Sequence, residues 1–98
     1  MNKKILQFFQ ALSDETRLSI VLSIMDSPKA VTDIHKAIDS DITLSAVSHQ
    51  LRYLSNLGII TCKRNGREKV YRPSDDFCWC ILKDADNHFN GKCGCCKK

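Results

Sequence analysis

The chain has 98 residues, of which 43% are hydrophobic and 27% are charged, and its formal net charge is +4. This composition supplies the core of one small globular domain, and the length is too short for two. The apolar stretch near the N-terminus is interrupted by Gln7 and Gln10 and lacks a small-residue cleavage site, so we expect no signal peptide. No apolar run approaches the length of a membrane span, and we therefore expect a cytoplasmic protein.

The N-terminal part of the chain predicts two helices. Apolar residues recur at helical spacing within residues 2–12. Ser13 and the two acids after it are a good start for a second helix, because acids stabilise the positive end of the helix dipole. That helix continues to Ser27 and Pro28, where the proline stops it.

A helix-turn-helix is predicted next. Thr32 is the expected cap of a short helix over residues 33–38. A longer helix begins near Thr43 and ends at Gly58, a residue type suited to the position after a helix C-terminus. Its expected apolar face consists of Leu44, Val47, Leu51, Leu54 and Leu57. Two helices joined by a short turn form a helix-turn-helix.

A β-hairpin and a last helix complete the predicted fold. Residues 59–64 and 69–72 are short and β-prone, and the Asn-Gly dipeptide at 65–66 is a strong hairpin signal. Ser74 is the expected cap of a helix that runs to His88. The order α-α-α-α-β-β-α describes a winged helix-turn-helix, a mainly α fold with a small β part.

Three segments together carry a family resemblance. They are ALSDETRLSIVLSI, TLSAVSHQLRYLSNLGII and the basic hairpin that ends in VYR. In this order, over residues 3–90, the chain resembles the ArsR/SmtB family of metal-responsive repressors. The resemblance implies a homodimer formed through the first and last helices, and a repressor that leaves DNA when its inducer binds. We expect a DNA-binding and dimerisation domain over residues 1–90 and a flexible, cysteine-rich tail over residues 91–98.

The fourth predicted helix offers polar side chains outside its apolar face. Ser, Gln and Arg can form hydrogen bonds with base edges, and residues at the helix start can reach phosphate together with backbone N–H groups. The alternative is a solvated polar face, but the resemblance places Ser48, His49 and Gln50 at DNA-facing positions. The candidates on this helix are Thr43, Ser45, Ser48, His49, Gln50 and Arg52.

Basic residues surround the predicted hairpin turn. From the sequence alone there are two interpretations of Lys63, Arg64 and Arg67. They are either solvated surface charges or part of a wing that contacts DNA phosphate. In a wing, they would add affinity that is independent of base sequence and sensitive to salt. A twofold dimer of this kind implies double-stranded operator DNA with an inverted repeat.

Five of the six cysteines lie at or beyond position 78. Cytosolic thiols are kept reduced, so metal binding or redox sensing is favoured over a disulfide framework. Thiolates are soft ligands that favour Cu(I), Cd(II), Pb(II), arsenite and, with four thiolates, Zn(II). Residues two apart in a helix do not share a face, whereas the tail cysteines can fold around one ion. The candidate metal ligands are Cys78, Cys80, Cys93, Cys95 and Cys96, with Asp75 and His88 as further candidates.

The resemblance also implies where inducer sites lie. In one family site on the last helix, an Asp and a His from one subunit meet a His and a Glu from the other. Counted from Tyr71, Asp75 and His88 fall on two of these positions, but Phe77 and Gly91 replace the other two. A second family site, a CxC ahead of the helix-turn-helix, has no counterpart here. The chain thus keeps only two of the four ligands of the oxygen-and-nitrogen site. Cysteines lie near both of these ligands in the sequence.

These observations predict a DNA-binding repressor that a thiophilic metal or metalloid ion releases from its operator. One alternative is a thiol redox or persulfide sensor of the same fold, in which Cys78 or Cys80 pairs with a tail cysteine. Another is a metal-buffering protein without an operator. An enzyme is not expected, because the sequence contains no Ser/His/Asp or Cys/His grouping set in a pocket-forming chain.

Overall fold

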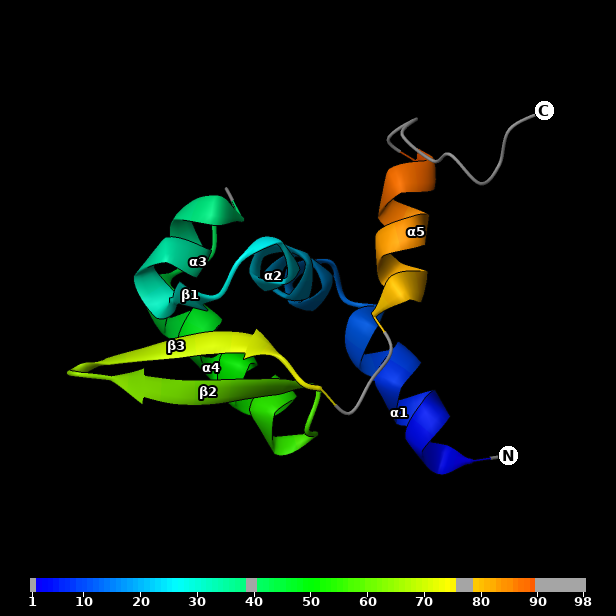
Figure 1. Ribbon diagram of the computed structural model, residues 1–98, viewed down its shortest axis with the longest axis horizontal. Helices are drawn as coiled ribbons and strands as arrows, with labels where there is room; N and C mark the ends of the chain where they lie inside the picture. The colour runs from blue at the N-terminus through cyan, green and yellow to red at the C-terminus, as the bar shows by residue number, and fades with distance from the viewer. Residues whose placement is uncertain (1, 39–40, 76–78, 90–98) are drawn as a thin grey trace.

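Residues 2–38, 41–75 and 79–89 are described by the computed structural model of the chain. Figure 1 shows α3, α4 and the sheet at one end of the molecule and α1 and α5 at the other, with α2 between them. This arrangement is a winged helix-turn-helix and confirms the predicted fold class. In the described ranges the helices are α1 (Lys3–Leu12), α2 (Glu15–Asp26), α3 (Val31–Ala37), α4 (Leu44–Asn56) and α5 (Cys80–Phe89), and the strands are β1 (Lys29–Ala30), β2 (Ile60–Asn65) and β3 (Glu68–Pro73).

The first two helices begin at side-chain caps. The Asn2 carboxamide oxygen accepts a hydrogen bond from the Lys4 N–H at 2.8 Å, and the Asp14 carboxylate accepts one from the Arg17 N–H at 3.1 Å. Such caps satisfy backbone donors that a helix start leaves unpaired. The cap of α2 is therefore Asp14, and Ser13 instead follows the last turn of α1, where its hydroxyl donates to the Gln10 carbonyl.

The short strand β1 has no counterpart in the predicted elements. Lys29 pairs with Tyr71 and Ala30 with Val70, so β1 joins β3 in an antiparallel sheet of order β1-β3-β2. This pairing keeps the chain extended as far as Ala30, and α3 begins directly after it. The prediction that Thr32 caps this helix was wrong, because Ala30 occupies the cap position without a side-chain hydrogen bond.

The hairpin forms as predicted, with its turn one position later. Its register runs from Ile60 opposite Pro73 to Asn65 opposite Glu68, which leaves Gly66 and Arg67 as the loop. Gly66 adopts a φ of 67°, a conformation that costs glycine little and other residues more.

The core joins the helix-turn-helix to the sheet through α2. Val47, Leu51 and Leu54 of α4 are all 0% exposed, as the predicted apolar face requires. Full burial of one such side chain stabilises the fold by about 1.5–3 kcal/mol. Leu44 was wrongly assigned to this face, because it begins the helix and is 42% exposed. The remaining fully buried large side chains are Ile20, Val21, Ile24, Ile34, Ile59 and Ile60.

The last described helix begins later than the sequence predicts. Ser74 is buried, its N–H donates to the Ile59 carbonyl at 3.0 Å, and its own carbonyl accepts the Trp79 indole N–H at 2.7 Å. Ser74 therefore anchors the end of the sheet, and the described helix starts at Cys80. Trp79 also packs against Phe8 of α1, with ring centroids 5.7 Å apart. Within the described ranges, no helix is long and apolar enough to cross a membrane.

Candidate nucleic-acid interface

The helix α4 is fixed at its start and along its buried face. The Thr43 hydroxyl caps it by accepting a hydrogen bond from the Ala46 N–H at 3.1 Å, which confirms the predicted start. His35 of α3 is linked to the segment just before α4 by a hydrogen bond of 2.8 Å between its Nε2 and the Ile42 carbonyl. Because a carbonyl only accepts, this Nε2 carries the proton. Ser45, Ser48, His49 and Arg52 consequently stand exposed on a rigidly placed helix.

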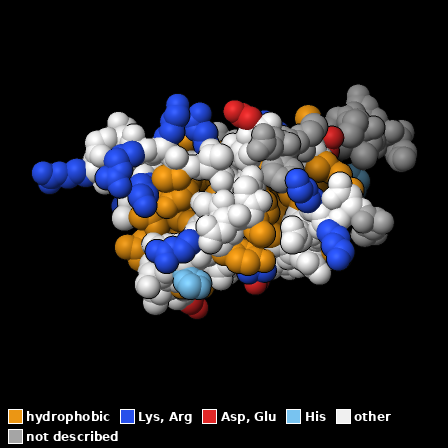
Figure 2. Space-filling model, turned by 90° about the horizontal axis from the view of Figure 1, so that it is seen from below, with side chains coloured by type: hydrophobic (Ala, Val, Ile, Leu, Met, Phe, Trp, Pro, Cys, Tyr) orange, Lys and Arg blue, Asp and Glu red, His pale blue; other side chains and the backbone are white. Residues whose placement is uncertain are grey.

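The β2–β3 hairpin carries most of its charge as exposed cations. Lys63, Arg64, Arg67 and Lys69 are exposed there, and Glu68 is the one acid within the hairpin residues 60–73. Arg64 lies directly opposite Lys69 across the ladder. Like charges in this arrangement repel and destabilise a hairpin. Figure 2 shows Lys and Arg side chains gathered toward the hairpin end of the face it presents.

A groove of about 610 Å³ lies between α4 and the hairpin. The Ser48 and Arg52 side chains line it from the helix, and Arg64 and Arg67 line it from the hairpin. The structure thus brings together four of the predicted DNA-binding residues in one basic groove. Thr43, Ser45, His49 and Lys63 lie outside this lining.

The floor of the groove contains two residues that sequence reasoning did not assign to a site. Tyr71 and Cys62 are cross-strand partners, and both line the groove. Burial raises the pKa of the Tyr71 phenol above its ordinary value, and a side-chain hydrogen bond with Cys62 adds to this, while the nearby Arg52 lowers it. The phenol is therefore neutral at physiological pH and can donate a hydrogen bond.

Gln50 differs from the other candidates on α4, because it is half-buried. Its side-chain oxygen accepts a hydrogen bond of 3.3 Å from Nη1 of Arg17 on α2. Sequence reasoning missed Arg17, although one signal was available. A cation in the first turn of a helix opposes the helix dipole, so its presence there indicates a specific partner.

The predicted metal ligands are only partly within the described residues. Cys80 begins α5 and is exposed, and His88 lies in the last turn of that helix, with its ring 5.0 Å from the Phe89 ring. Eight residues of helix separate these two side chains by about 12 Å along the axis, so one ion cannot bind both within one chain. In the described ranges, no group of three or more His, Cys, Asp or Glu side chains is placed to hold a metal. Cys78, Cys93, Cys95 and Cys96 lie outside the described residues.

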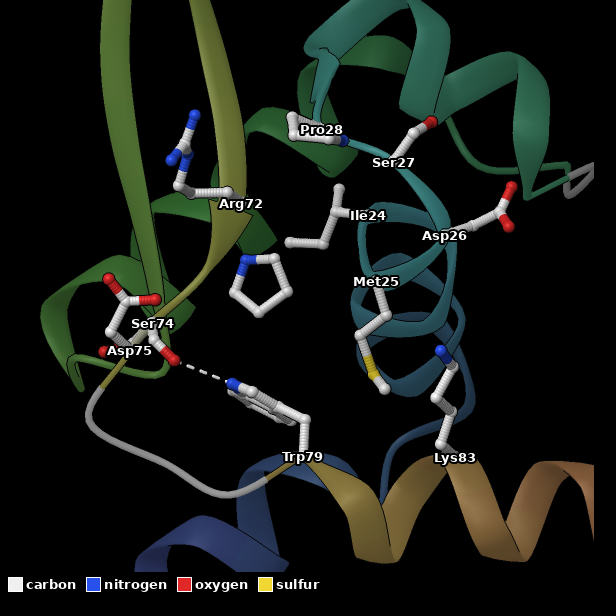
Figure 3. Close-up of a pocket in the computed structure, with 11 residues that line it drawn as sticks. Ile24, Met25, Asp26, Ser27, Pro28, Arg72, Ser74, Asp75, Trp79 and Lys83 are labelled. Carbon is white, nitrogen blue, oxygen red and sulfur yellow. Dashed lines mark hydrogen bonds between the residues drawn. The ribbon is translucent and has the colours of Figure 1, made fainter.

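Asp75, the remaining candidate ligand, lies on the wall of a different cavity. This cavity, of about 490 Å³, lies between the end of α2, the end of β3 and the start of α5. Figure 3 shows Ile24, Met25 and Trp79 around it, with the Trp79 indole directed at the Ser74 carbonyl. Asp75 is therefore close to the start of α5, which also carries Cys80.

Solved structures of similar fold are winged helix-turn-helix proteins. The solution structure of apo-NmtR superposes with a TM-score of 0.72 and 37% sequence identity, covering 91% of this chain and 73% of that one. The homodimeric winged helix-turn-helix DNA-binding domain of a possible ArsR-family transcriptional regulator from Mycobacterium bovis gives a TM-score of 0.73 at 22% identity, covering 91% and 84%. The second comparison supports the fold alone.

Curated relatives match most of the chain. NmtR of Mycobacterium tuberculosis, an HTH-type transcriptional regulator, is 42% identical over 81% of the chain and 64% of its own length. A homologue of the cadmium resistance transcriptional regulatory protein CadC from Staphylococcus aureus is 35% identical over 82% and 65%. The chain thus spans less than two thirds of the length of these relatives. Residues 14–61 match the family described as "Bacterial regulatory protein, arsR family". Together with the superposition on apo-NmtR, this match places the chain in the arsR family of bacterial regulatory proteins.

Proposed function

We propose that the protein is a transcriptional repressor that binds double-stranded operator DNA as a homodimer and leaves it when a thiophilic metal or metalloid ion binds. The groove between α4 and the hairpin carries this proposal. Arg52 of the helix and Arg64 and Arg67 of the hairpin converge there from separate elements. A groove lined by cations beside an exposed polar helix suits the phosphates and base edges of a duplex.

The hairpin charges support a polyanionic partner. Arg64 and Lys69 face one another at a cost to hairpin stability, and DNA phosphates would relieve this repulsion. On α4, Ser48, His49, Gln50 and Arg52 would contact the major groove, while Thr43 and Ser45 would meet phosphate at the helix start. Lys63, Arg64 and Arg67 would extend the contact along the backbone from the wing.

Exposed apolar side chains on α1 and α5 support a second copy of the chain as the other partner. Ile5 and Phe9 of α1 are 53% and 51% exposed, and Ile81 and Phe89 of α5 are 57% and 85% exposed. Apolar side chains gathered on adjacent helices mark an interaction surface. The homodimeric relative from Mycobacterium bovis is consistent with this occupant. A twofold dimer of winged helices requires an inverted-repeat operator, with half-sites about 34 Å apart or a multiple of that distance.

The chemistry of the cysteines supports a soft inducer. Thiolates favour Cu(I), Cd(II), Pb(II), arsenite and, with four thiolates, Zn(II) over harder ions. Cys80 would combine with Cys78 and with tail residues Cys93, Cys95 and Cys96 as ligands, and Asp75 and His88 are further candidates. Since Cys80 and His88 lie at opposite ends of α5, a site using both would take them from different subunits. The chain's residues fit such an ion by donor type, and its binding would require deprotonated thiols.

Linkage connects the two sites. An ion that binds better to a dimer poorly matched to DNA weakens DNA binding by the same factor. Its ligands would lie on or next to α5, and Trp79, the residue just before α5, packs against Phe8 of α1. Because such a repressor acts on operator DNA in the cytoplasm, the proposed location of the protein is cytoplasmic.

Titration of operator binding under reducing conditions tests this function. Sequence selection with the full-length protein would first define the operator. Fluorescence anisotropy would then follow release by Cu(I), Zn(II), Cd(II), Pb(II) and arsenite. Release by oxidant without metal would favour the thiol redox alternative, and failure to select any DNA sequence would contradict the proposal.

A further inference from the structure

Arg17 is held by three groups on two neighbouring helices. Its Nε donates to the Ala11 carbonyl, in the last turn of α1, at 2.8 Å. Its Nη1 donates to the Gln50 side-chain oxygen on α4 at 3.3 Å. Its guanidinium carbon lies 4.7 Å from the centre of the Tyr53 ring, also on α4. These contacts fix the guanidinium plane, since a planar fork loses its freedom once two nitrogens are bonded and one face is stacked.

The contact decides which way the Gln50 amide points. A guanidinium has donors only, so the amide atom facing Arg17 must be the oxygen. The amide NH2 group then points away from Arg17. Among the described residues it has no hydrogen-bond partner, and it is not a buried atom. Gln50 therefore offers a donor of fixed orientation on the flank of α4.

We propose that Arg17 is a specificity-determining positioning residue, which makes Gln50 read the operator as a hydrogen-bond donor. This inference rests on the proposed DNA-binding function. An amide that is free to flip can face either an acceptor or a donor on a base edge. Held by Arg17, it selects the major-groove acceptors N7 and O6 of guanine, N7 of adenine or O4 of thymine. It rejects a base edge that offers only an amino group, such as that of cytosine.

The test compares selected operators for the full-length wild type and its Arg17→Ala variant. We expect Arg17→Ala to reduce discrimination at one base pair of each half-site by about tenfold, the scale of one good base contact. Affinity for random-sequence DNA should change no more than in Lys3→Ala, which removes one exposed positive charge at the start of α1. A uniform loss of affinity over all sequences, or an unchanged base preference, would overturn the inference.

A double-mutant cycle separates action through Gln50 from direct contact with DNA. In a Gln50→Ala background, Arg17→Ala should have no further effect on base discrimination, because the positioned group is already gone. An equal effect with and without Gln50 would mean that Arg17 contacts DNA itself. Arg17→Lys, which keeps the charge but lacks the fork, should behave as Arg17→Ala does.

A reversal experiment remains decisive if the Arg17 variants fail to fold. In Gln50→Glu, Arg17 would hold one carboxylate oxygen, and the other would face DNA as an acceptor. Cytosine, whose major-groove edge offers only an amino group and which the wild type should reject, should then be accepted at that position. Continued rejection of cytosine by a folded Gln50→Glu protein would refute the inference. A wild type that selects no operator at all would instead overturn the proposed function on which it rests.

Discussion

Removal of two wing arginines should change the salt dependence of DNA binding by a calculable amount. Arg64 and Arg67 are exposed and line the groove beside α4. If each neutralises one phosphate, a dimer lacking them in both protomers loses four phosphate contacts. Each contact contributes about 0.9 to the slope of log K against log salt, so the slope should become shallower by roughly 3.6. Between about 50 and about 200 mM salt, the wild type should therefore lose roughly 100-fold more affinity than the variant does.

Fluorescence anisotropy with the selected operator measures this slope directly. The double variant Arg64→Ala/Arg67→Ala is compared with Lys3→Ala/Lys4→Ala, which removes the same charge from exposed positions on α1. The control should keep the wild-type slope, because its charges lie at the far end of the molecule from the hairpin (Figure 1). The double variant should also bind specific and random DNA more weakly by the same factor, since phosphate contacts carry no base information. A slope unchanged from wild type would exclude the wing from the interface.

Three further substitutions and one truncation test other parts of the molecule. Leu51→Ala, at a site that is 0% exposed, should lower the free energy of unfolding by about 3 kcal/mol in urea titrations, and a loss below about 1 kcal/mol would contradict the burial. Phe9→Asp should convert the proposed dimer to a folded monomer in analytical ultracentrifugation, and an intact dimer would remove the exposed face of α1 from the interface. The raised pKa of Tyr71 contributes stability that is present below its unfolded pKa of about 10 and is lost as pH rises through the folded pKa. Thermal melting of Tyr71→Phe should therefore lack part of this alkaline loss, and an identical pH profile would contradict the shift. A chain truncated after Asn90 should still bind the operator but fail to release it with the ion that releases the full-length protein. Full sensitivity of the truncated protein would exclude the tail from the site.

Periodic burial made most of the fold predictable. The buried face of α4 follows from apolar residues that recur at helical spacing, and the local sequence at Thr43 was enough to predict the cap of this helix. In α2, the same spacing predicted the helix but not its buried face, which is formed by Ile20, Val21 and Ile24. The errors share one cause. Thr32 and Ser74 are good caps by local preference, but pairing of Ala30 with Val70, and the bond between the Ser74 N–H and Ile59, fix the backbone otherwise. Contacts between distant segments override local propensity, and a strand of only two residues has no sequence pattern that predicts it.

The sequence predicted which residues of α4 belong to the candidate site, but not which neighbouring elements their side chains face. Helical spacing correctly placed Ser48 and Arg52 outside the apolar face, and the structure adds that both face the hairpin. The same spacing gave no sign that Gln50 meets Arg17, because that contact depends on how α2 packs against α4. The proposed ligands Cys78, Cys93, Cys95 and Cys96 stay a prediction from sequence.

The contacts of Arg17 offer a physical route from the proposed dimer interface to base recognition. Its guanidinium bonds both to the last turn of α1 and to Gln50, so a shift of α1 would act on the side chain that holds Gln50. Coupling between an inducer and DNA is worth about 1–3 kcal/mol in regulated proteins. A good base contact is worth about the same, and a dimer has one such contact in each half-site. Release of Gln50 in both protomers would therefore be large enough to account for loss of the operator. The core formed by Val47, Leu51 and Leu54 need not rearrange for this release, because only the side chain of Gln50 changes its contacts while these three buried side chains keep α4 in place.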